Sequence, residues 1–366
     1  MKNEMRILFV IHDMVVGGSG KQLAMTANGL LLKGHQVFVY TYCGKELSHK
    51  LNENVVYIPQ NPLPRNKLTE YLFSIVNVRK QIKKIRPDVV ISWRCNAAFF
   101  VNLASLGLKV KTIFSERNDP NNVSSLFIKI ASFVSEFSSG GVFQLENIRK
   151  YYKKLYKKSI VIPNPIAIES CENDLQACNQ REKKIVNVGR MYIPQKRQDV
   201  MLEAFKEFTK NHPDYTLHFL GDGRDLEYVK KMAQNLDLSE KVFFHGAVAA
   251  PIDVIRDAQM LVLTSDFEGI PNVVLEAFAV GLPVISTDCS PGGARFLLGD
   301  SEYGLLVPKG DVFGISLAMT RMADNKKEAD FFAKKGRIRL QNFNPSKIID
   351  MWDAYLKKIV CFRGLL

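Results

Sequence analysis

Short apolar runs alternate with longer stretches of helical periodicity along the first half of the chain. The runs are rich in β-branched and aromatic residues, which is typical of buried strands. We predict strands at Met5–Ile11, Gln36–Tyr42, Val55–Ile58, Asp88–Trp93, Val110–Ser115, Gly141–Gln144 and Ser159–Ile162, and helices near residues 20–33, 68–86, 96–107, 122–137 and 145–158. This alternation predicts a mostly parallel sheet covered by helices on both faces.

The second half repeats the scheme after Pro163-Asn164-Pro165, because two prolines disfavour a continuing helix or central strand. A polar stretch, Glu169–Glu182, follows them. Further strands are predicted at Lys184–Val188, Thr216–Leu220, Lys241–His245, Met260–Leu263, Pro283–Ser286 and Gly304–Val307.

We therefore predict two doubly wound α/β domains, residues 1–165 and 183–344, facing each other across a cleft. A C-terminal helix at 345–362 is expected to pack back on the first domain. Ligands of such sheets bind outside the carboxyl ends of the strands, so the site is expected at the cleft.

Composition narrows the class of protein. The 366 residues are 46% hydrophobic and 24% charged, which fits two globular domains and excludes a disordered chain. The longest apolar stretch, 97–108, is interrupted by polar residues, and the start leads directly into a strand, so neither a spanning helix nor a signal peptide is expected. Six cysteines without a Cys-x-x-Cys pair indicate reduced thiols and a cytoplasmic protein.

The excess of positive charge lies in the first half. Residues 1–165 hold 24 Lys/Arg and 10 Asp/Glu, a net charge of +14, whereas the remaining residues hold 26 and 27, a net charge of −1. Much of it surrounds the predicted helix at 145–158, where Leu145, Ile148, Tyr152 and Leu155 share one face. This pattern fits either ordinary helices with solvated lysines or attachment to an anionic membrane surface. Nucleic acid fits the charge as well, but no nucleic-acid-binding motif accompanies it.

A glycine-rich loop, Gly17-Gly18-Ser19-Gly20-Lys21, follows the first predicted strand. Glycines and free amides at a helix start favour bound anions. An ATP-binding P-loop is disfavoured because Gln22 stands where Ser or Thr is required and Val15 where the first glycine belongs. A plain strand-to-helix turn and a phosphate or acceptor loop remain as alternatives.

A basic loop, Gly189–Arg197, follows the strand that ends at Val188. It holds Arg190, Lys196 and Arg197. Fixed cations at this position could stabilise the charge that develops on a diphosphate leaving group. The alternative is a solvated basic turn.

The block Ser265–Glu276 is the most specific segment of the chain. It leaves a buried strand, turns at Gly269 and enters a helix. Glu268 and Glu276 could accept hydrogen bonds from sugar hydroxyls, and the amides of Gly269–Val273 would face phosphates. Because apolar residues flank Glu276 on both sides, we expect that its carboxylate has a partner.

The spacing of Glu268 and Glu276, with the sequence up to Ile285, resembles the signature of family 4 glycosyltransferases. Further matching pieces follow one another in family order over nearly the whole chain. They are Gly17-Gly18, Ala27-Asn28-Gly29-Leu30, Lys33-Gly34-His35, Pro163-Asn164-Pro165, Gly189-Arg190 with Lys196, Gly221-Asp222-Gly223, His245-Gly246, Gly292-Gly293 and Gly304-Leu305-Leu306-Val307-Pro308.

The resemblance implies the GT-B fold, a nucleotide-sugar donor held by the second domain, and retention of anomeric configuration. It implies that Arg190 and Lys196 contact the donor phosphates, that Glu268 binds sugar hydroxyls and that Glu276 binds the ribose. The remaining expected ligand contacts are phosphate amides at Gly189, Gly269, Ile270, Asn272 and Val273, the base at His245 and Gly246, and the acceptor at Gly17 and Gly18. Glu116 and Arg117 follow a first-domain strand that is expected to face the cleft, and they resemble a segment of enzymes that extend lipid-linked bacterial glycans. Glu116 is expected among the catalytic residues.

One segment departs from the family pattern. Many relatives carry a glutamate after the paired glycines, where this chain has Ala294-Arg295-Phe296, so that role does not transfer. The chain also lacks an Asp-x-Asp metal pair, which agrees with metal-independent donor binding and no other cofactor.

The leading hypothesis is a retaining enzyme that moves a hexose or N-acetylhexosamine from a UDP-sugar. The expected acceptor is a polyprenyl-diphosphate-linked or polysaccharide glycan, and the expected location is the inner face of the cell membrane. The alternatives are a nucleotide-sugar epimerase of the same fold and a non-enzymatic basic membrane-binding module.

Overall fold

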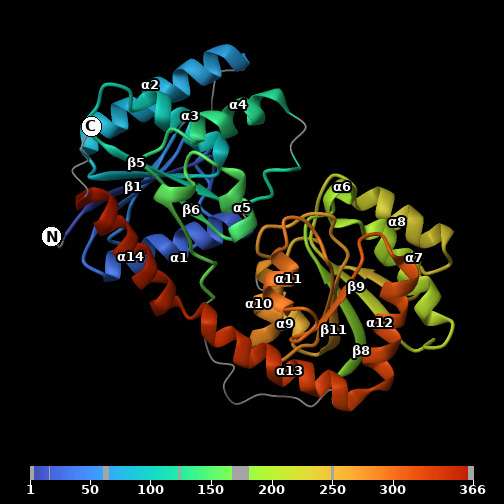
Figure 1. The fold of residues 1–366 in the computed structure, drawn as a ribbon. Coiled ribbons are helices and arrows are strands. Elements are labelled where there is room, and N and C mark those ends of the chain that lie inside the picture. The colour runs from blue at the N-terminus through green and yellow to red at the C-terminus, as the bar shows by residue number, and fades with distance from the viewer. Residues whose placement is uncertain are drawn as a thin grey trace. The chain divides into compact units, whose positions relative to one another are not determined.

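The computed structural model describes residues 4–15, 17–60, 66–122, 125–166, 181–248 and 251–361. The chain divides into two compact units (Figure 1). Unit 1 comprises Met1–Pro165 and Pro345–Leu366, and unit 2 comprises Ile166–Asn344. The expected polar linker lies outside the described residues except for its last two positions, as does residue 362 of the expected C-terminal helix.

Unit 1 is built on a parallel sheet of seven strands in the order β3-β2-β1-β4-β5-β6-β7. The central strands β1 and β4 are almost wholly buried, which explains their continuous apolar sequences. The strands are β1 Arg6–Ile11, β2 Gln36–Thr41, β3 Val56–Pro59, β4 Val89–Trp93, β5 Lys111–Glu116, β6 Gly140–Phe143 and β7 Ser159–Val161.

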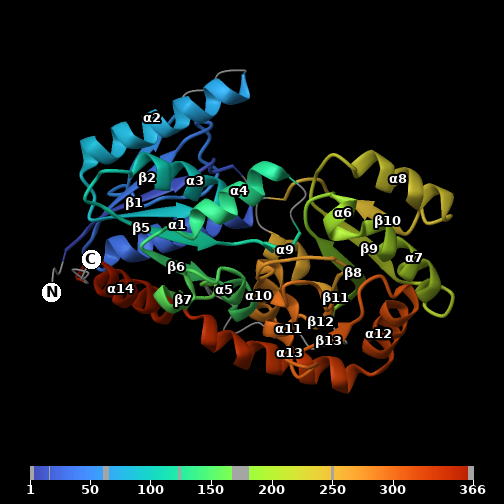
Figure 2. The same cartoon turned by 45° about the horizontal axis from the view of Figure 1, so that its top comes forward.

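Helices cover both faces of this sheet, as the sequence predicts. α2, α3 and α4 lie on one face, and α1 and α14 lie on the other (Figures 1 and 2). The helices are α1 Gly18–Leu32, α2 Lys67–Ile85, α3 Cys95–Ala104, α4 Leu126–Ser135, α5 Glu146–Tyr151, a 3₁₀ turn Tyr156–Lys158 and α14 Pro345–Cys361.

The last helix of the chain, α14, completes the core of unit 1. Trp352 is fully buried and stacks on Trp93, with ring centroids 6.0 Å apart. The Tyr355 hydroxyl accepts the Gly141 N–H at 2.9 Å and donates to the Lys158 carbonyl at 2.5 Å. The final segment of the chain therefore stabilises the unit formed by the first.

The helix expected at 145–158 is shorter in the structure. α5 ends at Tyr151, because Tyr152 has φ −87° and ψ 75° and the Lys154 N–H is bonded to the Glu136 carboxylate at 2.7 Å. The resulting turn still buries Tyr152 and Leu155, so the expected inward face is confirmed although the continuous helix was wrong.

Unit 2 is built on a second parallel sheet, in the order β10-β9-β8-β11-β12-β13. Its strands are β8 Glu182–Val188, β9 Thr216–Leu220, β10 Val242–Phe244, β11 Ala258–Leu263, β12 Val284–Thr287 and β13 Leu305–Val307. The chain adds strands on one side of β8 and then returns to add β11, β12 and β13 on the other. The carboxyl ends of β8 and β11 therefore form the switch point where ligands of such sheets bind.

Helices also cover both faces of the second sheet. α7, α8 and α12 lie on one face, and α9, α10 and α11 lie on the other (Figures 1 and 2). The helices are α6 Ile193–Lys196, α7 Gln198–Thr209, α8 Leu226–Asn235, α9 Pro251–Ile255, α10 Asn272–Ala279, α11 Gly293–Leu298, α12 Val312–Asp324, α13 Lys326–Leu340 and a 3₁₀ turn Gln341–Phe343. Among the described residues, no helix combines the length and the apolar character needed to cross a bilayer.

Candidate active site

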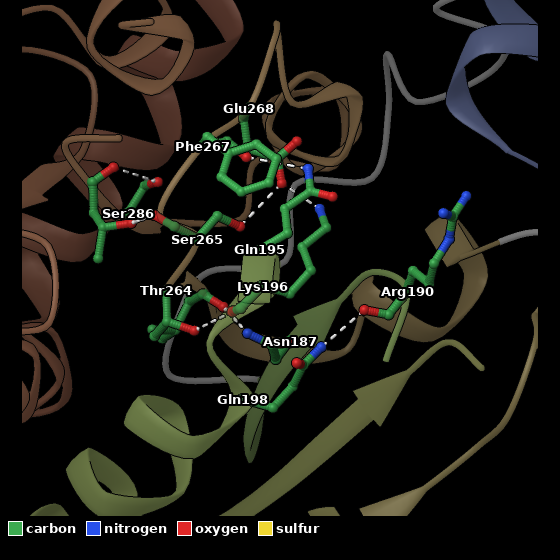
Figure 3. Close-up of polar contacts among 12 residues, drawn as sticks. Asn187, Arg190, Gln195, Lys196, Gln198, Thr264, Ser265, Phe267, Glu268 and Ser286 are labelled. Atoms are coloured by element: carbon green, nitrogen blue, oxygen red, sulfur yellow. Dashed lines mark hydrogen bonds and ion pairs between the residues drawn. The ribbon is translucent and has the colours of Figure 1, made fainter. Parts of the chain in front are cut away.

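Lys196 and Glu268 meet at the switch point of the unit 2 sheet (Figure 3). Lys196 ends α6, in the loop after β8, and Glu268 lies in the loop after β11. The Lys196 ammonium forms an ion pair with one Glu268 oxygen, and the Ser265 hydroxyl donates to the same oxygen at 2.9 Å. Because β8 and β11 are paired neighbours, their carboxyl ends bring together two charges that the sequence places in separate motifs.

Hydrogen bonds to backbone carbonyls hold these two loops against each other. The Asp266 N–H donates to the Gln195 carbonyl at 2.8 Å, and the Gln195 side chain donates to the Phe267 carbonyl at 3.1 Å. The Thr264 hydroxyl lies 2.9 Å from both the Lys196 and the Arg197 carbonyls. Sequence reasoning missed Gln195 and Thr264, because no local pattern shows a bond to a carbonyl 72 residues away.

Arg197 links the same loops through charge. Its guanidinium pairs with Asp266 at 3.2 Å and with Asp199 at 3.0 Å, and the Asp199 hydrogen bond raises the pKa of the guanidinium. Arg197 was expected among the three cations of the basic loop, and its contacts indicate that it positions the loops. Arg190 is exposed, and its guanidinium is drawn apart from the Lys196–Glu268 pair (Figure 3).

Two glycines allow the loops to approach this closely. A Cβ on Gly293, at the start of α11, would lie 1.5 Å from the Gly269 carbonyl oxygen. A Cβ on Gly221, in the loop after β9, would lie 2.0 Å from the Gly189 carbonyl oxygen. No side chain fits at either position, so both glycines fix the shape of the loops that carry Glu268 and Arg190.

Glu276 lies one turn into α10 and is 7% exposed. Every residue from Val273 to Ala279 is buried, so the expected apolar surroundings of this carboxylate are confirmed. Glu276 does interact within the protein, as expected for a buried charge. Gly269, Ile270, Asn272 and Val273 form the turn before α10 and its first residues, where the positive end of the helix dipole lies.

His245 and Gly246 lie at the same edge of the sheet, after β10. The Gly246 carbonyl accepts the Gly221 N–H at 2.7 Å, which ties this loop to the Gly221 loop. The exposed His245 lies 2.8 Å from a ring nitrogen of His218. Burial and the nearby Lys184 lower the pKa of His218 to about 4, so the His218 ring is neutral at pH 7.

The remaining candidate residues belong to unit 1. Gly17 and Gly18 are exposed at the start of α1, after β1. Glu116 ends β5, is 3% exposed and accepts the N–H groups of Arg117 at 2.8 Å and Asn118 at 3.1 Å. Burial raises the pKa of the Glu116 carboxyl. Glu116 lines a small cavity of about 60 Å³ together with Arg94, Cys95, Asn118, Asp119 and Ser132.

Arg117 follows Glu116 but is not among the residues that line this cavity. Its guanidinium lies 4.2 Å from the centroid of the Trp93 ring and donates to Ser115 at 3.0 Å and Asn164 at 3.1 Å. Burial lowers the pKa of Arg117 to about 9. These contacts make it a packing residue of unit 1.

The segment Ala294-Arg295-Phe296, which departs from the family pattern, places one side chain in the core and one at the surface. Ala294 is fully buried, and the exposed Arg295 forms ion pairs with Asp288 at 2.5 Å and with Asp300. A surface cation therefore occupies the segment in which many relatives carry a glutamate.

Comparison with known proteins matches each half of the chain to a glycosyltransferase model. Residues 16–170 match the model described as Glycosyltransferase Family 4, and residues 174–339 match the model described as Glycosyl transferases group 1. The chain belongs to the family 4 glycosyltransferases. The activity class expected from the resemblance is thereby confirmed.

The glycosyltransferase is similar to two curated proteins along almost their whole length. An uncharacterized glycosyltransferase of Haemophilus influenzae is 24% identical, with 95% of this chain and 98% of the relative covered. A Campylobacter jejuni enzyme is 27% identical, with 97% of this chain and 99% of the relative covered. That enzyme is named as an α-1,4-N-acetyl-D-galactosaminyltransferase acting on GalNAc-α-(1→4)-GalNAc-α-(1→3)-diNAcBac-PP-undecaprenol.

The fold of the glycosyltransferase also matches a solved structure. Anabaena HepE, in a complex with UDP and glucose, superposes with a TM-score of 0.80 at 17% identity, with 96% of this chain and 99% of HepE covered. The expected GT-B fold, with a parallel sheet in each unit, is confirmed.

Proposed function

We propose that this glycosyltransferase transfers a hexose or N-acetylhexosamine from a UDP-sugar, with retention, to a lipid-linked oligosaccharide or a polysaccharide. The observation that carries the proposal is the convergence of Lys196, Glu268 and the start of α10 at the switch point of unit 2. A cation, a carboxylate and the N-terminal end of a helix together fit a diphosphate bonded to a sugar.

Each group has a distinct role in the proposed donor complex. Lys196 and Arg190 neutralise the diphosphate as its bond to the sugar breaks, and the amides of Gly189, Gly269, Ile270, Asn272 and Val273 hydrogen-bond its oxygens. Glu268 accepts hydrogen bonds from the sugar hydroxyls, and Glu276 accepts them from the ribose. His245 and Gly246 hold the base.

The transfer step requires no dedicated protein base. The bond between the anomeric carbon and the phosphate oxygen breaks with its electron pair, which remains on the diphosphate. The acceptor oxygen bonds the anomeric carbon on the same face, and its proton moves to the departing phosphate oxygen. Charge stabilisation by Lys196 therefore supplies the main rate enhancement.

Unit 1 is proposed to bind the acceptor. Gly17 and Gly18 give close backbone access at the start of α1, and Glu116 offers a buried carboxylate beside a small polar cavity. The Campylobacter relative named for an undecaprenol-linked glycan supports a lipid-linked acceptor. The excess positive charge of residues 1–165 supports a peripheral location at an anionic membrane, on its inner face.

A donor and acceptor screen tests the proposal. Purified protein is incubated with UDP-sugars, with and without polyprenyl-diphosphate glycans, in the presence of EDTA, and released UDP is measured. We expect acceptor-dependent UDP release that EDTA does not change. Conversion of the donor sugar without an acceptor would instead indicate an epimerase, and binding without turnover would indicate a non-enzymatic module.

A further inference from the structure

Helix α4 exposes an apolar stripe to solvent. Leu126, Ile130, Phe133 and Phe137 are 73%, 46%, 54% and 62% exposed. Their spacings of four, three and four residues place them on one side of α4 and the turn that follows it. The opposite side of α4, with Ala131, Ser132 and Ser135, is buried against α3. The helix is therefore apolar on the face where a surface helix is normally polar.

The neighbouring helix α2 contacts α4 and exposes further apolar side chains. Tyr71 of α2 stacks on Phe127 of α4, with ring centroids 4.6 Å apart. Leu72 and Val76 of α2 are also exposed. Figures 1 and 2 both show α2 and α4 on the same face of the unit 1 sheet. A clustered apolar surface of this kind marks an interaction site, whereas single exposed apolar residues do not.

One lysine lies against the stripe, and others are exposed nearby in the sequence. The Lys154 ammonium lies 4.5 Å from the Phe133 ring centroid and 4.6 Å from that of Phe137. The sequence of α4, LFIKIASFVS, contains Lys129 and no acidic residue. Further exposed lysines follow at positions 150, 153, 157 and 158. Apolar side chains with a cation against them complement a surface with acyl chains beneath anionic headgroups.

We infer that α4 inserts its apolar stripe into the headgroup–acyl boundary of an anionic membrane. This inference rests on the proposed lipid-linked acceptor and goes beyond charge attraction, because it assigns hydrophobic insertion to named side chains. Ile128 and Ser132, on the inner side of α4, line the same cavity as Glu116. Membrane-bound α4 therefore holds the proposed acceptor pocket close to the polyprenyl diphosphate in the bilayer.

The inference predicts two separable components of membrane binding. Lysine contacts are screened at about 1 M salt, where the Debye length is about 3 Å, whereas burial of the stripe is not. Sedimentation with phosphatidylglycerol–phosphatidylcholine vesicles is measured at low and high salt. We expect Phe133→Ser with Phe137→Ser to lower the partition coefficient roughly 100-fold at both salt concentrations, about tenfold for each phenylalanine.

A matched pair on unit 2 provides the control. Phe313 and Leu317 of α12 are 66% and 52% exposed, so Phe313→Ser with Leu317→Ser removes a similar apolar area elsewhere. We expect that variant to partition as the unaltered protein does. Lys153→Gln with Lys154→Gln is expected to weaken binding at low salt only.

Fluorescence reports insertion directly. Both native tryptophans, Trp93 and Trp352, are buried, so a Phe133→Trp substitution adds an exposed reporter. We expect its emission to shift to the blue with vesicles and to be quenched by brominated acyl chains. Phe313→Trp is expected to show neither change.

Three results would overturn the inference. One is unchanged vesicle binding by the serine pair, and another is unchanged Phe133→Trp emission. The third is a dimer in sedimentation equilibrium that the serine pair dissociates without any vesicle binding, because the stripe would then contact a second copy. UDP release with a water-soluble acceptor separates this inference from the proposed function. We expect the variant with both serine substitutions to release UDP as the unaltered protein does. If the unaltered protein releases no UDP, the proposed function alone is contradicted.

Discussion

Lys196 and Glu268 are held by contacts that their motifs alone do not reveal. Lys196 pairs with Glu268, and Ser265 bonds the same carboxylate. The residue types and their order were predictable, because carboxylates and cations at strand ends are visible in the sequence. The pairing was not, because it depends on which strands become neighbours in the sheet. Arg117 shows the same limit: the sequence marks a charge, and only packing against Trp93 shows its structural role.

Replacing Glu276 tests the proposed ribose contact. Glu276→Ala is expected to weaken UDP binding by about 1.5–3 kcal/mol, the range for a hydrogen bond that involves a charged group. Isothermal titration calorimetry measures the dissociation constant. The exposed Glu203→Ala on α7 is the control and should bind UDP normally. An unchanged dissociation constant in Glu276→Ala would remove this assignment.

The ionisation of Glu116 gives a pH-dependent prediction. Burial raises the pKa of this carboxyl above its ordinary value of 4.5. When the pKa of a carboxyl is higher in the folded than in the unfolded state, its contribution to the free energy of unfolding is fully present below the pKa of the unfolded state. That contribution is lost as the pH rises through the pKa of the folded state. Glu116→Gln removes that loss and keeps an oxygen for the Arg117 and Asn118 amides. The Tm of Glu116→Gln minus the Tm of the unaltered protein should therefore be larger at pH 8 than at pH 4. An equal difference at both pH values would contradict the burial account.

At the scale of the elements, periodicity predicted the strands within one or two residues, because parallel strands covered on both faces are apolar throughout. Helix ends were less predictable. The helix expected at 145–158 ends at Tyr151, because the Glu136 carboxylate bonds the Lys154 N–H. The exposed stripe of α4 was also not predictable, since an apolar helical pattern normally indicates burial.

The contact between α11 and the Glu268 loop gives a prediction at this scale. Gly293→Ala places a Cβ 1.5 Å from the Gly269 carbonyl oxygen, so the loop must move. Overpacking of this kind costs about 1–3 kcal/mol. We expect a lower Tm and weaker UDP binding, measured by calorimetry. A variant with normal Tm and normal UDP affinity would show that the loop is not held by this contact.

At the scale of the whole molecule, the chain forms two units, each with its own sheet and candidate residues. The last helix, α14, belongs to unit 1, so the two ends of the sequence share one core while the middle forms unit 2. The GT-B fold and the family were predictable from ordered motifs along the chain. The role of α14 in the unit 1 core depends on the stacking of Trp352 on Trp93.

Trp352→Ala tests this division of the chain. Loss of a buried tryptophan costs about 3–5 kcal/mol, and we expect that cost in unit 1 alone. UDP should still raise the unfolding temperature of unit 2, because a ligand stabilises the unit that binds it. Differential scanning calorimetry with and without UDP measures both effects. Loss of the UDP-dependent shift in this variant would contradict independent units.

The proposed transfer reaction is tested most directly by the rate of acceptor-dependent UDP release in Lys196→Ala, compared with the unaltered protein and with the exposed-lysine variant Lys326→Ala. Lys196 is proposed to stabilise the departing diphosphate, so its loss should lower kcat by about 10²–10³. Lys326→Ala should turn over normally. A Lys196→Ala enzyme that releases UDP at the rate of the unaltered protein would contradict the proposed active site.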